Sequence, residues 1–418
     1  MRKLITFLGV LSSNAQPVGY RHHGQIYEGL VFAEALQQFC PHDMMLLCVT
    51  QGAKEKTLPL VRERTKVLDD PRVHIIDIPT GLDSEQMWDT FKTIVDHVND
   101  DDCVMFDITH GLRSISFLVF LFAAYLKSAK NVHIDAIYYG ALDLRNQTTD
   151  SVAPVIDLSE FSAMLDWLMA TNQFVRNGDG SDLAGLIRAG KPAASPLSAE
   201  LANPVLRDQM ENMAGVIEQM SLALSLTRPL ETMQRASALR ARLQNAGSSI
   251  ARQALPFSVL ADKVGSAYTP FALLDPLAEQ NLKVDLRLQL GMLKWYIDKR
   301  AYVQAATLGR ELVVSLVAYG LGKDQITDLK GVREPVEEAL NQYSGKRSLC
   351  STPYTDDDIR KIDANRTLVA LWKDLRYLRN DLAHVGMNQK GVAAALLVDR
   401  LRGLYPRIES FAFSVLDN

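Results

Sequence analysis

The chain has 418 residues, which is too long for one ordinary hydrophobic core and predicts roughly two or three domains. Its apolar fraction of 47% and charged fraction of 22% are typical of a globular protein in water. The formal net charge of -4 argues against a protein that coats nucleic acid through a bulk basic excess, but it leaves room for an enzyme that grips RNA locally.

The first 150 residues or so alternate short apolar runs with helical patterns. The runs predict strands at residues 4–10, 44–50, 73–79, 103–109 and 132–139. Each run is almost continuously apolar, as expected for strands buried on both faces. Helical patterns lie between them at 26–39, 58–68, 85–98 and 114–126. This alternation predicts an α/β domain built on a Rossmann-like, doubly wound parallel sheet.

Nothing in this half predicts export or a membrane. The opening strand pattern is not followed by a small-residue cleavage site, so we expect no signal peptide. The longest apolar stretch, 115–126, is too short to span a bilayer. The four cysteines, Cys40, Cys48, Cys103 and Cys350, form no C-x-x-C pair and indicate neither a zinc site nor a disulfide framework. A reducing, cytoplasmic location is expected.

From about residue 157 onward the strand patterns disappear. A helix is expected at 161–174, followed by a connection at 177–196 that is rich in Gly, Ala and Pro. Further helical patterns occupy 204–224, 231–246, 276–299, 302–320, 337–343, 367–385 and 390–413. The second half is therefore expected to be all-helical and to end in a helical bundle.

The helix expected at 367–385 has opposed apolar and polar stripes. Its apolar stripe consists of Leu371, Leu375, Leu378 and Leu382, and its polar stripe of Lys373, Arg376, Asn380 and His384. Arg379 lies between the two faces and is turned roughly 140° from His384 on a straight helix. The two side chains do not converge by themselves. Either Arg379 reaches around the helix, or a second copy of the helix supplies the partner group across a dimer axis.

These residue types suit metal-independent RNA cleavage. A histidine can move protons at a 2′-hydroxyl or at a leaving 5′-oxygen near neutral pH. Arg379 can hold a phosphate bidentately and stabilise transition-state charge, and Asn380 can orient the histidine or a phosphate oxygen. No carboxylate cluster suited to a metal is evident. The arginine–histidine spacing alone, however, is more typical of a solvated helix face than of an active site.

A second group of polar residues follows the expected parallel strands, at the edge where open α/β sheets bind ligands. It comprises Gly9, Ser12, Ser13, Asn14, Thr50, Asp107, Thr109, His110, Gly111 and Arg113. A glycine and exposed amides at a helix N-terminus favour a phosphate, and Arg113 adds a counter-charge. The absence of G-x-G-x-x-G and G-x-x-x-x-G-K-[ST] argues against a dinucleotide or a nucleoside triphosphate. In an alternative interpretation, His110 and Arg113 only cap and neutralise the turn.

Two strings in the sequence resemble family signatures. D-I-T-H-G-L-R at 107–113 resembles the D-x-T-H-G-x-R signature of CRISPR-associated Rossmann-fold (CARF) sensor domains, in the subgroup whose members continue into a HEPN ribonuclease. R-N-D-L-A-H at 379–384 resembles the R-x(4–6)-H motif of the HEPN superfamily. Glu311 lies in an arginine–glutamate segment similar to an earlier helix of such bundles, and no catalytic role is assigned to it. The chain departs from the family in the loop at 10–14, which is longer than the usual Gly-Thr-rich loop.

The resemblance implies a type III CRISPR antiviral ribonuclease. Residues 1–155 would be a CARF sensor of cyclic oligoadenylate, with cyclic tetra-adenylate favoured and cyclic hexa-adenylate possible. Residues 156–270 would be a helical linker region, and 271–418 a HEPN domain. The activated homodimer or higher homo-oligomer would cut single-stranded RNA with Arg379, Asn380 and His384, leaving 2′,3′-cyclic phosphate ends. No metal, other cofactor, DNA or membrane partner is expected.

Two other functions remain open from the sequence. A nucleotide-sensing adaptor would bind the same ligand and cut nothing. A ring nuclease would degrade its own activator in the N-terminal pocket, an activity that could coexist with RNA cleavage. A transcription factor is not indicated, because no helix-turn-helix with a basic recognition helix is evident.

Overall fold

The computed structural model describes residues 1–111, 113–148, 150–189, 204–253, 255–346, 351–363, 366–387 and 392–417. Cys350 lies outside the described residues, as does the side chain of Arg113. The chain divides into two compact units, Met1–Asp166 and Trp167–Asn418. Across the described ranges, no helix is both long and apolar enough to cross a membrane.

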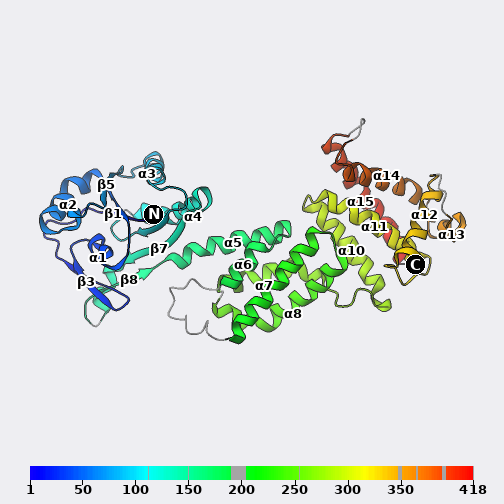
Figure 1. Ribbon diagram of the computed structural model, residues 1–418, viewed down its shortest axis with the longest axis horizontal. Helices are drawn as coiled ribbons and strands as arrows, with labels where there is room; N and C mark the ends of the chain where they lie inside the picture. Colours follow the sequence, from blue (N-terminus) through cyan, green and yellow to red (C-terminus); the bar gives the residue numbers. More distant parts are fainter. Residues whose placement is uncertain are drawn as a thin grey trace. The chain divides into compact units, whose positions relative to one another are not determined.

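In its described part, the first unit is built on an 8-stranded sheet with the order β3-β2-β8-β7-β6-β1-β4-β5 (Figure 1). The strands predicted from apolar runs are β1 (Arg2–Leu8), β4 (Met44–Val49), β5 (Val73–Asp77), β6 (Cys103–Asp107) and β7 (His133–Gly140). They are neighbours in the sheet and pair in parallel. The predicted parallel sheet is confirmed.

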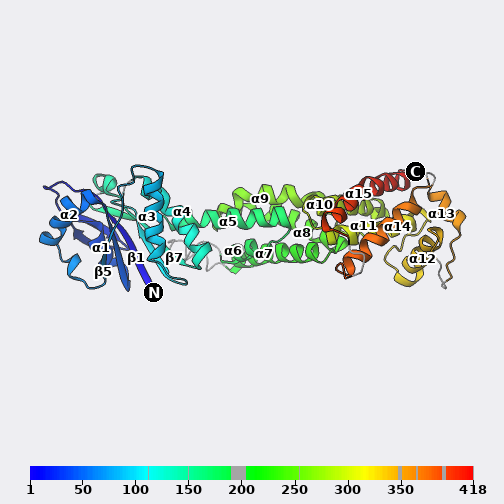
Figure 2. The same ribbon diagram turned by 90° about the horizontal axis from the view of Figure 1, so that it is seen from above.

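Helices cover both faces of this sheet (Figures 1 and 2). The helices are α1 (Phe32–Phe39), α2 (Gln51–Arg64), α3 (Ser84–Asp96) and α4 (Arg113–Lys130). Alternate residues of β1 serve the two faces: Leu4 and Leu8 pack with α1 and α2, whereas Ile5 and Phe7 pack with α3 and α4. This period of two on a strand buried from both sides explains its unbroken apolar sequence, and the doubly wound arrangement is confirmed.

Three strands were not predicted: β2 (Val18–His22), β3 (Gln25–Gly29) and β8 (Ala153–Asp157). The helix expected at 26–39 is wrong in its first part, because β2 and β3 form a hairpin there. The connecting residues His23 and Gly24 have φ of 46° and 80°, the positive values that tight two-residue hairpins require. Helix α1 begins after this hairpin. The carboxylate of Glu34, in the first turn of α1, accepts the backbone N–H groups of Leu30 and Val31, which directly precede the helix.

The second unit is all-helical in its described part, as predicted. Its helices are α5 (Ser159–Asn177, which begins in the first unit), α6 (Ser181–Ala189), α7 (Pro204–Ser225), α8 (Pro229–Gln253), α9 (Leu255–Tyr268), α10 (Leu282–Asp298), α11 (Tyr302–Gly320), α12 (Glu334–Tyr343), α13 (Asp356–Ile362), α14 (Leu368–Ala383) and α15 (Ala394–Leu416). The loop expected at 177–196 is wrong where α6 forms, since Leu183, Ala184 and Ile187 supply a buried face. Asp179 caps that helix by accepting the Ser181 N–H at 3.1 Å.

Helix α11 is deeply buried in the second unit. Its residues from Leu312 to Ala318 are all buried, and α10, α14 and α15 pack around it. Gly309 lies close to its neighbours here, since a Cβ at that position would be 3.4 Å from Ile408 and 3.6 Å from Leu293, within ordinary contact distance. The buried core of α11 thus provides the rigid support on which α14 and α15 are placed.

An acidic side chain is buried in α10. Asp285 is fully buried and accepts the Gln289 Nε2 amide at 2.9 and 3.1 Å. Burial raises the pKa of Asp285 to about 6, although the amide hydrogen bond lowers it in part. The folded protein therefore has its full free energy of unfolding below the pKa that Asp285 has in the unfolded chain. Part of this free energy is lost as the pH rises through about 6, because the buried carboxyl must then ionise.

Asp285→Asn is expected to stabilise the protein in a pH-dependent way. Near pH 8 the substitution removes a buried charge and should raise the free energy of unfolding by up to about 3 kcal/mol. Near pH 3 wild type and variant should differ little, since Asp285 is then largely neutral in both the folded and the unfolded chain. Denaturant titrations at the two pH values measure this difference. An equal effect at both pH values would contradict the raised pKa.

Candidate active site and ligand site

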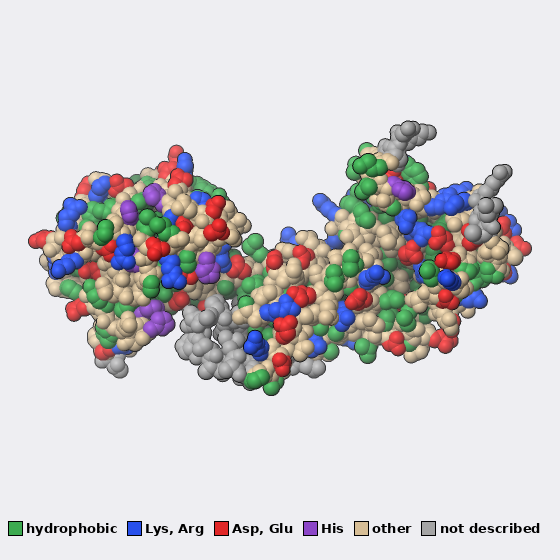
Figure 3. Space-filling model, in the orientation of Figure 1, with side chains coloured by type: hydrophobic (Ala, Val, Ile, Leu, Met, Phe, Trp, Pro, Cys, Tyr) green, Lys and Arg blue, Asp and Glu red, His purple; other side chains and the backbone are tan. Residues whose placement is uncertain are grey.

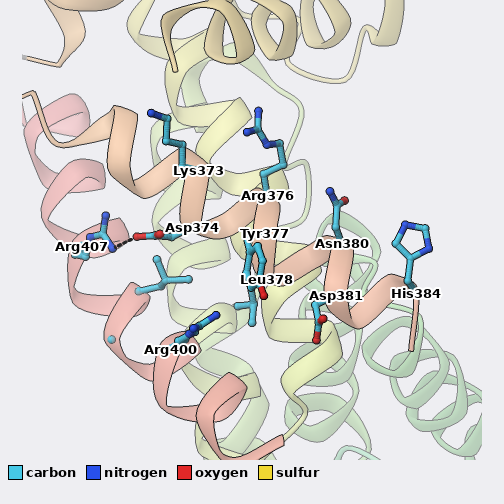
Figure 4. A pocket seen from close by; sticks show the side chains of 12 residues that line it. Lys373, Asp374, Arg376, Tyr377, Leu378, Asn380, Asp381, His384, Arg400 and Arg407 are labelled. Atoms are coloured by element: carbon cyan, nitrogen blue, oxygen red, sulfur yellow. Dashed lines mark hydrogen bonds and ion pairs between the residues drawn. The ribbon is translucent and has the colours of Figure 1, made fainter. Parts of the chain in front are cut away.

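An open pocket of about 1010 Å³ lies between α14 and α15 (Figure 4). Its lining is rich in polar and cationic side chains and consists of Lys373, Asp374, Arg376, Tyr377, Leu378, Asn380, Asp381, His384, Arg400, Gly403, Leu404 and Arg407. Asn380 and His384 stand one turn apart and project on the same side of α14 in the close view. The pocket therefore combines an imidazole, a group able to transfer protons, with guanidinium and ammonium groups that suit a phosphodiester.

Arg379 is not part of this pocket lining. Its side chain is exposed, and within the described residues it makes no hydrogen bond or ion pair. This placement follows from the helical repeat, because adjacent residues point about 100° apart. One copy of the chain thus brings together two of the three predicted catalytic side chains, Asn380 and His384, and leaves Arg379 on the outer surface.

The end of α14 determines where His384 stands. His384 is the C-cap residue directly after the last helical residue, Ala383, and its backbone N–H donates to the Asn380 carbonyl at 2.9 Å. The helix predicted to reach residue 385 ends here, because Val385 and Gly386 take φ of 50° and 69°. In this turn the Gly386 N–H donates to Asp381 and the Met387 N–H to the His384 carbonyl. Val385 is β-branched, so its left-handed backbone is strained, by about 1–2 kcal/mol.

Val385→Asn is expected to raise the stability of the second unit by about 1 kcal/mol, because asparagine tolerates the left-handed conformation. In a domain of this size the melting temperature should rise by about 2–4 °C. Gly386→Ala is the matched control and should lower stability by a similar amount, since Gly386 also has positive φ. Thermal unfolding of the two variants measures the effects. Equal shifts of the same sign would contradict the strain.

Sequence reasoning missed the part of the pocket that α15 supplies. Arg400 and Arg407 are seven residues apart, hence about two turns, and lie on one face of α15 with Gly403 between them. The Arg407 Nη1 bonds Asp374 at 2.7 Å, and the Arg400 guanidinium lies 5.3 Å from the Tyr377 ring centroid. The arginine spacing was visible in the sequence, but only the packing of α15 on α14 reveals the shared pocket. Figure 3 shows Lys and Arg side chains gathered over α14.

In the first unit, the residues that follow β1 and β6 meet at one edge of the sheet. A Cβ on Gly9 would lie 2.5 Å from the backbone oxygen of His110, closer than such contacts occur. Gly9 is thus the residue type that this approach requires. Gly111 is less constrained, since its nearest neighbour would be Phe7 Cβ at 3.5 Å. Arg113 begins α4 beside this edge.

Asp107 and Thr109 hold the turn between β6 and α4 together. Asp107 is fully buried and accepts the Thr6 hydroxyl at 2.6 Å and the Thr109 N–H at 2.7 Å. The Thr109 hydroxyl oxygen accepts the Gly140 N–H at 2.7 Å, which ties the turn to β7. The side chains of Asp107 and Thr109 thus already have hydrogen-bond partners within the protein. These hydrogen bonds hold the backbone amides at this edge in place.

His110 is held in a neutral state. Its Nε2 accepts the Phe32 N–H at 3.3 Å, which requires that this nitrogen carry no proton. Burial lowers the pKa of His110, although the charge of Asp107 opposes the effect. The imidazole therefore joins the β6–α4 turn to α1 and contributes no positive charge at neutral pH.

The remaining predicted ligand residues lie in the loop after β1 and at the start of α2. Ser12, Ser13 and Asn14 are exposed in a turn that the Ala15 N–H closes on the Ser12 carbonyl at 2.9 Å. Thr50 caps α2, where its hydroxyl oxygen accepts the Ala53 N–H at 3.4 Å. The loop thus presents exposed hydroxyl and amide groups, whereas Thr50 is engaged by its own helix.

Comparison with known proteins gives one significant relative in sequence. No family model matches the chain. A segment of 113 residues is 32% identical to a CRISPR-associated protein of Methanocaldococcus jannaschii, and it covers 26% of this chain and 18% of that protein. Enterococcus italicus Csm6 bound to cyclic hexa-2′-fluoro-hexa-dAMP aligns over 99% of this chain and 94% of that chain, with 10% sequence identity and a TM-score of 0.45. Over about a quarter of its length, this chain is similar to a CRISPR-associated protein.

Proposed function

We propose that the protein is a CARF–HEPN endoribonuclease of type III CRISPR defence that a cyclic oligoadenylate activates. The pocket between α14 and α15 carries the proposal, because His384 and Asn380 share it with Lys373 and Arg376. The CRISPR-associated relative supports the biological setting. An imidazole and a guanidinium can supply proton transfer and charge stabilisation, so the proposed chemistry needs no metal ion.

In the proposed reaction a ribose 2′-hydroxyl attacks the adjacent phosphate and the 5′-oxygen leaves. His384 moves a proton at one of these oxygens, and Asn380 orients the imidazole or a phosphate oxygen. Arg379 stabilises the charge on the phosphate oxygens. The products are a 2′,3′-cyclic phosphate and a 5′-hydroxyl. Single-stranded RNA is the proposed substrate, because an internal attack requires a 2′-hydroxyl and a flexible backbone.

The proposed catalyst is a homodimer. Arg379 is exposed and does not line the pocket of its own chain, so a second copy is the proposed source of the arginine that faces His384. An exposed apolar face on α4 supports self-association: Phe117 is 73% exposed, Leu121 52% and Tyr125 48%. Apolar patches of this kind on a folded protein are typical of protein–protein contacts.

The proposed activator site is the edge of the sheet after β1 and β6. Gly9 brings the two loops together, and α4 begins there with its N-terminal amides. Such amides favour phosphate groups, which a cyclic oligoadenylate carries in a ring. Ser12, Ser13 and Asn14 are exposed and are the proposed side-chain contacts, together with Arg113. Activation requires that the ligand bind the active arrangement more tightly than the idle one.

The proposal is tested by incubating the protein with labelled single-stranded RNA and, in separate reactions, cyclic tri-, tetra- or hexa-adenylate. We expect cleavage with at least one ring and none without a ring. Absence of cleavage with every ring would overturn the nuclease proposal and favour the adaptor. If the activator is linearised and this persists in His384→Ala, the protein is also a ring nuclease.

A further inference from the structure

A buried asparagine on α12 contacts two residues of α14. Asn341 is only 7% exposed, and its Oδ1 accepts Trp372 Nε1 at 3.2 Å and Arg376 Nη1 at 3.4 Å. Trp372 and Arg376 are one helical turn apart, so a single carbonyl oxygen links both to α12. This contact fixes one end of the Arg376 guanidinium.

Trp372 is itself held in place by charged residues behind it. The Arg310 guanidinium lies 5.3 Å from the Trp372 ring centroid and bonds the carboxylates of Glu311 and Glu337. Arg333 bonds Glu311 at 2.6 Å from the other side. Burial would raise the pKa of Glu311, but the hydrogen bond from Arg333 and the charge of Arg310 lower it. Glu311 is therefore ionised at neutral pH, and its ion pair with Arg310 helps to hold the indole that Asn341 contacts.

Arg376 differs from the other cations of the pocket. Arg407 is paired with Asp374, and Arg400 lies over Tyr377. Lys373 is exposed and has no ion pair in the described part of the chain. Arg376 is half-buried, and its guanidinium donates to the neutral amide of Asn341. This amide leaves the positive charge of Arg376 uncompensated, and the hydrogen bond orients the remaining N–H donors of the guanidinium. It stands on the face of α14 that carries Asn380 and His384 (Figure 4).

We propose that Arg376, positioned by Asn341, binds a phosphate of the RNA strand that flanks the scissile phosphate; this inference rests on the proposed function. Arg376 and His384 are eight residues apart, hence about 12 Å along the helix axis, which favours two different phosphates. The arginine fork binds a phosphate oxygen pair, and the amide prevents it from swinging into solvent. Asn341 is a positioning residue and touches no substrate.

The test uses RNA binding by the full-length His384→Ala protein, with and without each cyclic oligoadenylate, over a range of salt concentrations. Adding Arg376→Ala should weaken binding about tenfold and reduce the slope of log affinity against log salt by about 0.7, the value for one phosphate contact on a single strand. Arg402→Ala is the matched control, since Arg402 is exposed on α15 and does not line the pocket. It should leave both quantities unchanged.

The role of Asn341 is tested with Asn341→Asp, which keeps an acceptor for Trp372 and Arg376 but cancels the charge of the guanidinium. It should reproduce the weaker binding and the smaller salt slope, and adding Arg376→Ala should then have no further effect. In the activated nuclease, Arg376→Ala should raise KM more than it lowers kcat, as for binding that ground and transition states share.

Two results would overturn the inference: unchanged affinity and salt slope in Arg376→Ala, or no RNA binding by the His384→Ala protein under any condition. If binding depends on Arg376 but wild type cuts no RNA with any activator, the proposed nuclease function fails and the phosphate site stands. The two proposals are therefore separable.

Discussion

His384→Ala is expected to slow RNA cleavage by the activated protein by a factor of about 10²–10⁴, the range that general acid–base catalysis contributes. His384 is exposed at the end of α14, and only its backbone serves the helix turn. The substitution should therefore leave the melting temperature within about 1 °C and preserve RNA binding. Single-turnover cleavage of a labelled RNA measures the rate. A fully active variant would remove His384 from the mechanism.

The same residue allows a test of the dimeric site. Arg379→Ala and His384→Ala are each expected to be inactive as pure proteins, because Arg379 and His384 from different chains would share one centre. Dimers formed by mixing the two variants would contain one intact arginine–histidine pair and should regain part of the activity. If the mixture stays as inactive as the separate variants, each chain uses its own Arg379 and the composite site is wrong.

Gly9→Ala is expected to abolish activation by the cyclic oligoadenylate. The added Cβ would lie 2.5 Å from the His110 carbonyl oxygen, so the ends of β1 and β6 must move apart. Overpacking of this kind costs about 1–3 kcal/mol and displaces the amides at the proposed ligand edge. Ligand binding by calorimetry and thermal stability should both fall.

Gly111→Ala is the control for stability, because its Cβ would meet Phe7 at 3.5 Å, an ordinary contact. It should keep the melting temperature close to that of wild type even if it perturbs the ligand. Should Gly9→Ala bind the activator normally and respond to it, the close approach of the two strand ends is not needed for sensing.

The sequence allowed the central part of the first unit to be predicted, but not its edge. Strands such as β1 and β6 are buried on both faces and therefore read as unbroken apolar runs. The strands of the β2–β3 hairpin are only partly buried, and Ile26 is 55% exposed. The spacing of apolar residues from Ile26 onward therefore resembled the first turn of a helix. Its real signal was local, in the turn at His23–Gly24, where both residues need positive φ.

The site was predictable to the extent that one helix carries it. The helical repeat alone places Asn380 on the same side as His384, as Figure 4 shows, and it puts Arg379 on another side of the helix. In the structure Arg379 does not line the pocket. Contributions from other helices could not be derived, because they depend on tertiary packing. Asn341 is 35 residues from Arg376, and Arg407 is 33 residues from Asp374. No local pattern links residues so far apart in the chain.

The single oxygen of Asn341 that serves both Trp372 and Arg376 has a consequence for how the protein can diverge. A change at residue 341 alters a core contact and a pocket contact in the same step, so few single substitutions preserve both. Homologues that replace the indole at 372 lose one of the two reasons to keep an amide at 341. We expect positions 341, 372 and 376 to vary together, which an alignment of homologues would display as covariation.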